Sequence, residues 1–372
     1  MLIKRMLIKR TLTLLAVLTV LLATSLAACG DSSDETTTTI ASAPTTDTAD
    51  EPEVDELTLV THESFALSEG TLEQFTEQTG ITVNVLQSGD AGAVVSQAIL
   101  TKDSPIADVM YGIDNTFLSR ALSEGIFLEY ESDHLDTVPD ALVVDPHVTP
   151  INFGDVCVNY DRAAFTDTPP PETLSDLTDP EYRDMLVVQD PASSSPGLAF
   201  LLATVGTFGE EGDYTWRDYW ADLKDNGVTV TSGWSDAYYG EFSGGGEGGD
   251  RPIVVSYASS PAVGVYFTDP PPAEAPTGSM LDGCFRQVEY AAILAGTESP
   301  DAAGMLVDFL LSVPVQEDIP LNMFVFPANS EAEIPQVFTD FSPIPVDPVL
   351  VPAETIEQNR EEWINEWTDT LR

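Results

Sequence analysis

The sequence predicts an α/β fold in which two lobes enclose a ligand cleft. From residue 57 onward, short β-rich runs alternate with amphipathic helical segments, a pattern typical of a mostly parallel sheet with helices on both faces. The span from 57 to 372 is longer than one hydrophobic core usually serves, which favours two lobes. Polar and aromatic residues gather where the predicted strands end, and such sheets bind ligands outside the carboxyl ends of their strands.

The first 28 residues have the pattern of a bacterial lipoprotein signal peptide. Four basic residues precede an apolar run from Leu12 to Ala28. The run stops at Leu26-Ala27-Ala28-Cys29, which resembles the lipobox whose cysteine is lipidated after cleavage, so Cys29 is the predicted lipidation site. The alternative is a transmembrane anchor, for which the run is slightly short. Either segment places the remaining chain outside the cytoplasmic membrane.

Residues 29–56 are predicted to be a disordered tether. Thr, Ser, Asp and Glu dominate the segment, and it holds almost no large apolar side chains. Such a composition buries too little apolar area to offset the entropy lost on ordering. The tether would hold the folded body away from the lipid surface.

The charge balance is strongly acidic. Loss of the signal peptide removes four of the 14 Lys and Arg residues and none of the 62 Asp and Glu residues, which leaves a net charge of −52. This charge excludes nucleic acid as a partner and argues against binding to anionic lipid, so we expect membrane contact through the lipid anchor only. An acidic surface suited to a saline habitat would explain most of it, and a cationic ligand is compatible with it.

Two cysteines, Cys157 and Cys284, fall within the predicted body. Both lie in strand-like stretches, and two thiols in an oxidising compartment form one disulfide more often than a metal site. We therefore predict a disulfide between neighbouring strands, with two buried free thiols as the alternative. His62, His134 and His147 lack the spacing of metal ligands, so no metal site is predicted.

The first lobe is predicted to alternate three strands with three helices. The strands are expected at 57–62, 81–87 and 107–114, and the helices at 71–80, 91–102 and 115–125. Leu72 and Phe75 share one face of the first helix, which Gly80 ends. Asn115 is the predicted N-cap of the third helix, and Gly125 ends it.

The second lobe repeats the alternation. Strands are predicted at 185–190, 228–234 and 252–257. Ser195 is the predicted N-cap of the helix after the first of these strands, with Pro196 in its first turn. The three serines at 193–195 offer hydroxyls and backbone N–H groups, which suit an anion; the simpler interpretation is that Ser195 only caps the helix.

The lobes are predicted to be discontinuous in sequence. We expect lobe 1 to combine 57–155 with 285–372, and lobe 2 to span 156–284. A helix is predicted at 300–313, and a terminal helix at 354–371 could belong to either lobe. Trp363 and Trp367 in that last helix are four residues apart, a spacing that favours core packing.

The strand ends contribute the first candidate ligand residues. Asp90 and Asp114 lie at or just after the ends of first-lobe strands, and Trp234, Tyr238 and Tyr257 lie at or just after the ends of second-lobe strands. The sequence thus predicts a cleft with carboxylates on one side and aromatic rings on the other.

Several stretches resemble the thiamine-binding proteins of bacterial ABC transporters. In order, they are ADVMYGIDN, NYDR, DPASSSPGLAFLL, VTVTSGWSDAYYGEF, VVSYASSP, MFVFPAN and REEWINEWTDTLR. The resemblance covers nearly all of 57–372. It implies a type II periplasmic-binding-protein-like fold, with crossover strands between the lobes. It also implies capture of thiamine, or its mono- or diphosphate, for an ABC permease and its ATPase, without catalysis or a cofactor; we expect a monomer.

The resemblance further implies ligand contacts, position by position. They are Asp90, Ala91, Ser194, Ser195, Trp234, Tyr257, Ala258, Ser259, Ser260 and Pro261. Aromatic faces can stack on the rings of thiamine, and a cation–π contact with its thiazolium contributes about 0.5–2 kcal/mol. Asp90 can offset the positive charge, Asp114 is a second carboxylate nearby, and Tyr238 and Phe324 are further candidate contacts. Ser194 and Ser195 suit a phosphate or the hydroxyethyl tail.

Three positions depart from the family pattern. Val263 stands where an aromatic residue is frequent, although Tyr266 lies one turn further on. Phe324 occupies a common tryptophan position, and Ala91 a usual glycine position. These departures bear on the affinity and on the preference among phosphorylated forms.

Some features are also compatible with other functions. The adjacent Tyr238 and Tyr239 resemble the paired tyrosines of ferric-ion-binding proteins, and carboxylates with aromatic rings would also suit a polyamine. A secreted hydrolase could use Asp90 and Asp114 for acid–base chemistry. However, no G-x-S-x-G motif precedes the serines, and no histidine stands in a recognisable catalytic pattern.

Overall fold

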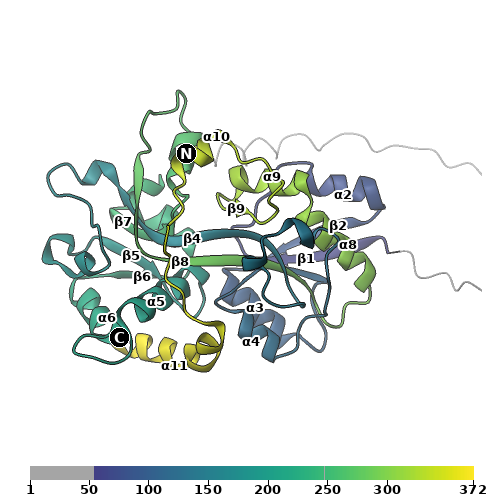
Figure 1. Cartoon of the computed structure of the whole chain (residues 1–372), viewed down its shortest axis with the longest axis horizontal. Helices are drawn as coiled ribbons and strands as arrows, with labels where there is room; N and C mark the ends of the chain where they lie inside the picture. Colours follow the sequence, from purple (N-terminus) through teal and green to yellow (C-terminus); the bar gives the residue numbers. More distant parts are fainter. Residues whose placement is uncertain (1–53, 247) are drawn as a thin grey trace, which may run out of the picture. The chain divides into compact units, whose positions relative to one another are not determined.

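A single mixed sheet runs through both lobes (Figure 1). The computed structural model describes residues 54–246 and 248–372. Within them the strand order is β2-β1-β3-β8-β4-β7-β5-β6, and β9 pairs with β4. The predicted signal peptide, Cys29 and nearly all of the predicted tether lie outside the described residues. No helix in the described part of the chain is both long and apolar enough to cross a bilayer.

The first lobe carries the strand–helix alternation that the sequence predicts. Its elements are β1 (Glu56–Thr61), α2 (Thr71–Thr79), β2 (Thr82–Gln87), α3 (Ala91–Leu100), β3 (Val109–Asp114) and α4 (Leu118–Ser123). Strand β1 pairs in parallel with both β2 and β3, so the carboxyl ends of the three strands point the same way. Glu56, placed in the tether by sequence, is instead the first residue of β1 and pairs with Thr82.

The predicted N-cap of α4 is wrong. The helix begins at Leu118, and its N-cap position is Phe117. The Asn115 side chain instead bonds the backbone of strand β8, at Arg286 O and Val288 N. The carboxylate of Asp114 accepts the N–H groups of Thr116 and Phe117 in its place. The pairing of Asn115 with strand β8, which the local sequence does not indicate, therefore leaves Asp114 to accept the N–H groups of the turn.

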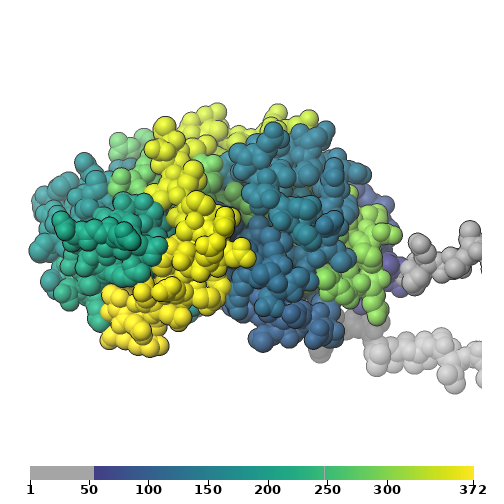
Figure 2. Space-filling view, turned by 60° about the horizontal axis from the view of Figure 1, so that its bottom comes forward, coloured from purple at the N-terminus to yellow at the C-terminus, as the bar shows by residue number. Residues whose placement is uncertain are grey.

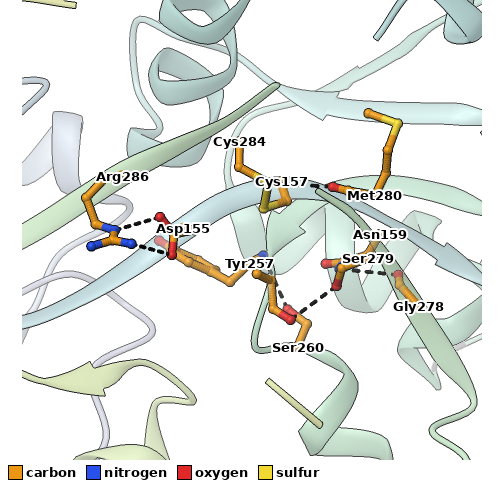
Figure 3. The surroundings of a disulfide bond; sticks show 11 residues. Asp155, Cys157, Asn159, Tyr257, Ser260, Gly278, Ser279, Met280, Cys284 and Arg286 are labelled. Atoms are coloured by element: carbon orange, nitrogen blue, oxygen red, sulfur yellow. Dashed lines mark hydrogen bonds and ion pairs between the residues drawn. A yellow bond between two sulfur atoms is a disulfide. The ribbon is translucent and has the colours of Figure 1, made fainter. Parts of the chain in front are cut away.

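Two long antiparallel strands, β4 (Thr149–Asp161) and β8 (Thr277–Ile293), connect the lobes. They lie side by side through the middle of the molecule, with β1 and β2 at one end and β5 to β7 at the other (Figure 1). The lobe boundaries expected near 155 and 284 fall inside these two strands. Cys157 and Cys284 form a disulfide between them, with a Cα–Cα distance of 4.4 Å (Figure 3).

The second lobe is built on β7. Its elements are β5 (Leu186–Gln189), α5 (Ser195–Phe208), α6 (Trp216–Asp225), β6 (Thr229–Thr231), β7 (Ile253–Tyr257) and α7 (Pro261–Tyr266). Strand β5 pairs in parallel with β6 and β7, and β7 pairs antiparallel with β4. A π-helical turn, Asp236–Glu241, follows β6, which ends before Trp234. The predicted N-cap of α5 is also wrong by one residue, because Ser194 occupies that position and Ser195 is the first helical residue.

The C-terminal segment returns across the junction of the lobes. It contains α8 (Pro300–Leu311), α9 (Val313–Asn322), β9 (Phe326–Pro327), α10 (Gln336–Phe341) and α11 (Ala353–Leu371). Helix α11 packs on α6 of the second lobe and on α4 of the first. Figure 2 shows the last part of the segment, in yellow, on the surface between the teal and blue parts. Trp363 and Trp367 are buried as predicted, with Trp367 packed edge-on against Trp220 at 5.5 Å between ring centroids.

Candidate functional site

The site forms where the carboxyl ends of first-lobe strands meet the second lobe. Asp90 caps α3 by accepting a hydrogen bond from Ala91 N through Oδ1 at 2.7 Å. Its other oxygen, Oδ2, accepts the backbone N–H of Trp234 at 3.0 Å. The Asp90 carboxylate therefore caps the N-terminus of a first-lobe helix and also accepts a hydrogen bond from the second lobe.

Glycine permits the close approach of the two lobes beside this contact. A Cβ at Gly92, in the first turn of α3, would lie 2.8 Å from the carbonyl oxygen of Ser193 and 2.7 Å from the Phe117 ring. Backbone oxygen of the second lobe thus occupies the space that a side chain at 92 would need. Ser64 and Ser235 also approach each other here, with hydroxyl oxygens 3.4 Å apart.

Asp114 and two serines bring unpaired polar atoms to the same junction. Asp114 is fully buried, and Ser194 and Ser195 are buried opposite it at the start of α5. Asp114 Oδ2 and both serine hydroxyls lack a hydrogen-bond partner of normal geometry. Burial raises the pKa of Asp114 to about 6, although the nearby Ser195 and Thr116 hydroxyls oppose the shift. Unpaired buried polar groups are costly, so these three atoms are available to a ligand or to water.

A second buried carboxylate, Glu289 of β8, is the centre of a polar network. It accepts hydrogen bonds from Asn152 Nδ2 at 2.8 Å and from the Tyr111 hydroxyl at 3.1 Å. Nε2 of His62 lies 3.4 Å from Glu289 Oε1. Burial raises the pKa of Glu289, but His62 and the hydrogen-bond donors outweigh it, so the pKa is lowered overall. Glu289 is therefore held ionised while buried.

Trp234 has one ring face covered by its own lobe. Its indole stacks on Tyr238 at 4.9 Å between centroids with a 17° interplanar angle, and its Nε1 donates to the Ser256 hydroxyl at 2.9 Å. Tyr238 is only 4 % exposed and packs with Val187, Phe242 and Val254 behind the tryptophan. Tyr238 therefore packs against Trp234 within the second lobe, whereas the sequence predicted that it faces the carboxylates across the cleft.

The turn from Tyr257 to Pro261 leads from β7 into α7. Tyr257 donates its hydroxyl proton to Gln287 Oε1 at 3.0 Å, and burial beside Glu289, Asp114 and Asp90 raises the pKa of its phenol. The Ser260 hydroxyl bonds Ser256 Oγ. It also accepts the backbone N–H of Tyr257 (Figure 3). Ala258 packs on the disulfide, and Pro261 opens α7. Tyr257 thus faces the same carboxylates as the first-lobe residues.

Phe324 reaches the site through the loop between α9 and β9. Its backbone has φ 55°, a left-handed conformation unusual for phenylalanine, and its carbonyl oxygen accepts the Ser259 hydroxyl at 2.5 Å. Its ring lies 5.9 Å from Phe267 and 6.2 Å from Tyr266 of the second lobe. The adjacent Met323 is in contact with the Tyr111 hydroxyl, so the loop extends to the Glu289 network.

The structure adds site residues that sequence reasoning missed. They are Tyr111, Asn152, Gln287 and Glu289. All four lie inside β3, β4 and β8, and a polar residue within a strand does not indicate its neighbours. His62 had a weak signal, because it is the last residue of the predicted first strand.

The arrangement suits a cation with flat rings. Asp90, Asp114 and Glu289 supply three carboxylates, and Trp234 and Tyr257 supply rings from the opposite lobe. Such groups can offset a positive charge and stack on aromatic ligands. Within residues 54–246 and 248–372, no cluster of three or more His, Cys, Asp and Glu side chains could hold a metal ion.

Comparison with known proteins adds independent information. A family model for bacterial extracellular solute-binding proteins matches residues 104–343. The thiamine-binding periplasmic protein of Brucella abortus biovar 1 (strain 9-941) is 31% identical over 322 residues, covering 84% of this chain and 91% of the relative. The thiamine-binding periplasmic protein of Escherichia coli (strain K12) is 28% identical, with 84% and 92% covered. These relatives confirm the resemblance seen in the motifs.

Solved structures share the fold. A periplasmic thiamin binding protein superposes with a TM-score of 0.75 at 24% identity, covering 85% of this chain and 96% of that one. Iron-bound HitA from Pseudomonas aeruginosa superposes with a TM-score of 0.68 at 21% identity, covering 85% and 99%. The predicted two-lobed α/β fold of type II is thereby confirmed.

Proposed function

The chain belongs to the bacterial extracellular solute-binding proteins, and on that premise we propose that it captures thiamine, or thiamine mono- or diphosphate, between its two lobes. Proteins of this family bind solutes, and the chain is not an enzyme. The captured ligand would pass to an ABC permease driven by its ATPase.

One observation carries the choice of ligand. The carboxylates of Asp90, Asp114 and Glu289 lie at the lobe junction near Trp234 and Tyr257. Thiamine combines a permanent thiazolium charge with a flat aminopyrimidine, so it uses both kinds of group. The relatives at 28–31% identity are named for binding the same molecule.

Each candidate residue has a proposed role in this site. Asp90 and Ala91 hold the ligand at the start of α3, and Trp234, supported by Tyr238, offers a ring for stacking. The hydroxyls of Ser194 and Ser195, buried and without partners, receive the hydroxyethyl tail or its phosphate. The turn from Tyr257 through Ala258, Ser259 and Ser260 to Pro261 forms the opposite wall. Asp114 accepts from ligand donors, and Phe324 covers the site from the outside.

The proposed setting is the outer side of the cytoplasmic membrane. The relatives are periplasmic proteins, and we propose that Cys29 carries a lipid that anchors the chain through residues 30–53. The disulfide between Cys157 and Cys284 is compatible with an oxidising compartment. We propose that the protein is a monomer. We also propose that it binds neither nucleic acid nor bare lipid, because its net charge is strongly negative.

Calorimetry on the chain from residue 30 onward tests the assignment. Thiamine and its two phosphates are titrated, with Fe³⁺ and spermidine in parallel. We expect sub-micromolar binding of thiamine or a phosphate. Trp234→Ala should weaken it at least tenfold, Trp234→Phe should weaken it less, and Leu100→Ala, at a position 85 % exposed, should not change it. Binding of Fe³⁺ or spermidine without thiamine binding would overturn the ligand and leave the solute-binding family intact.

A further inference from the structure

His62 is surrounded by acidic groups from three separate elements. Glu289 of β8 lies 3.4 Å from its Nε2, but the geometry is not that of a hydrogen bond. Asp90 at the start of α3 and Asp114 at the end of β3 also act on the imidazole electrostatically. The residue itself is 9 % exposed. A buried site with three carboxylates and one imidazole strongly favours a positive charge at its centre.

The position of the imidazole is built into the neighbouring strand. Gly112 in β3 has φ 92°, and a Cβ at this position would overlap Cδ2 of His62. Only glycine allows both that backbone conformation and the ring lying against the strand. The ring also lies near Tyr111, at 5.7 Å between centroids. The histidine is therefore fixed beside the carboxylates.

The same carboxylates are the groups that a cationic ligand would use. A protonated His62 would place a positive charge beside them. A thiazolium entering this cluster brings a second positive charge close to the first, and two buried like charges disfavour each other. Each positive charge therefore makes the other less favourable in this cluster.

We propose that His62 carries a proton in the ligand-free protein and that a cationic ligand displaces this proton when the lobes bind it. Binding of the cation therefore releases protons, and its affinity falls as the pH falls. The inference rests on the proposed function, because it requires a cationic ligand, and it assigns to His62 a role in charge exchange that no motif indicates.

The directions of the pKa values agree with this exchange. Burial lowers the pKa of His62, but Glu289, Asp90 and Asp114 outweigh burial and raise it overall. The pKa of Asp114 is raised to about 6, so this carboxyl is partly protonated in mildly acidic solution. The remaining titratable groups of the cluster are the phenols of Tyr111 and Tyr257, whose pKa values burial raises well above the usual range, so they stay neutral.

The sign of the pH dependence follows from linkage. A ligand cation lowers the pKa of His62 and of Asp114, so both groups lose protons on binding. Affinity then rises with pH until both groups are deprotonated in the ligand-free protein. Each proton released changes Kd by up to about tenfold per pH unit within the titrating range.

Calorimetry from pH 5.5 to 8.5 measures this exchange on the chain from residue 30 onward. Thiamine is titrated in two buffers with different ionisation enthalpies, which gives the number of protons released. We expect release of up to one proton near pH 6.5 and a Kd at least tenfold weaker at pH 5.5 than at pH 8.5. Deazathiamine, in which carbon replaces the charged nitrogen, is the neutral control and should show little proton release.

His62→Gln separates the histidine from the carboxylates. This variant should keep its affinity nearly constant above pH 6.5 and retain only the part of the pH dependence due to Asp114. Asp114→Asn should remove the acidic part and keep the part above pH 6.5. If thiamine binds and wild-type Kd is flat across the range, the exchange is overturned while the proposed function stands.

A measurement on the wild-type chain keeps the inference testable if the His62→Gln variant does not fold. NMR titration of the imidazole carbons in the wild-type chain, which has three histidines, gives the pKa of each. A His62 pKa above the ordinary 6.5, falling when thiamine is added, supports the exchange. A pKa below 6.5 in the ligand-free protein overturns it. Failure of thiamine to bind at every pH would instead refute the proposed function.

Discussion

The carboxylate of Asp90 accepts the backbone N–H of Trp234 at 3.0 Å, across 144 residues of sequence. The same side chain caps α3 through its other oxygen. The residue that bonds the second lobe therefore already has a structural task in the first lobe. An acidic group used in this way is oriented before a ligand arrives, which lowers the entropic cost of binding.

Substitution of Asp90 should separate capping from charge. Asp90→Ala removes the cap, at a cost of about 0.5–2 kcal/mol of stability, and also the contact with Trp234 N. Asp90→Asn keeps a capping oxygen and loses the negative charge. We expect both variants to bind thiamine at least tenfold more weakly, and only the alanine variant to unfold at lower urea concentration. Equal affinity of Asp90→Asn and wild type would show that the charge is not used.

Gly92→Ala should hinder lobe closure. The added Cβ would lie 2.8 Å from the Ser193 carbonyl oxygen and 2.7 Å from the Phe117 ring. Overpacking of this kind costs about 1–3 kcal/mol, and the part that involves Ser193 exists only when the lobes are together. We expect at least tenfold weaker ligand binding. Small-angle scattering should show a larger radius of gyration with ligand than for Gly240→Ala, a control with open space around its Cβ.

Removal of the disulfide should lower stability more than affinity. Cys157 and Cys284 close a loop with a sequence separation of 127, and they lie in strands that cross between the lobes (Figure 3). The double variant Cys157→Ala/Cys284→Ala should lose about 2–5 kcal/mol of unfolding free energy, as measured by urea denaturation. Wild type under reducing conditions should match it. A midpoint that does not shift in either case would contradict a stabilising role.

The ion pair between Asp155 and Arg286 should give a pH-dependent stability defect when broken. Arg286 donates to both carboxylate oxygens of Asp155, at 2.6 and 3.0 Å, and the Asp155 side chain is fully buried (Figure 3). Arg286→Leu should cost about 3–5 kcal/mol at pH 7, toward the lower end because the arginine is partly exposed.

The defect should shrink as the pH falls. Burial already raises the pKa of Asp155 against the opposing effect of Arg286, and loss of the arginine raises it further. A carboxyl with a raised folded-state pKa binds a proton more readily in the folded chain, so acidification restores stability relative to wild type. Urea denaturation at pH 5 and pH 7 measures this, and Arg286→Lys is the charge-conserving control. A defect that grows toward pH 5 would contradict the assignment.

Local patterns were sufficient for most elements of this protein. Phe75 and Gly80 indicated the buried face and the end of α2, and Gly80 does adopt the left-handed conformation, with φ 81°. The spacing of Trp363 and Trp367 indicated core packing, and both are buried. Periodicity and turn residues encode such features because the interactions that produce them join residues close in sequence.

Contacts between distant strands were decided only by the tertiary structure. The local sequence predicts Asn115 as a helix cap, but its side chain bonds the backbone of β8. Asp114 accepts the backbone N–H of Thr116 in its place. Helix α5 begins one residue earlier than the motif predicts, and the hydroxyls of Ser194 and Ser195 at its start are buried and unpaired. Tyr238 belongs to a polar stretch that also contains Trp234, but its ring is buried and stacks on the Trp234 indole.

The sequence by itself determined the class of protein and the order of its elements, and it indicated candidate site residues at the strand ends, because strand ends and turn residues can be read from local sequence. Tertiary structure decided which buried polar residues join them, since Asn152 and Glu289 become neighbours of Tyr111 only when β4 and β8 pair with the rest of the sheet. The same pairing brings Glu289 beside His62, a contact between residues far apart in the chain. Burial then gives these groups their altered proton affinities, a property of surroundings that no stretch of sequence contains.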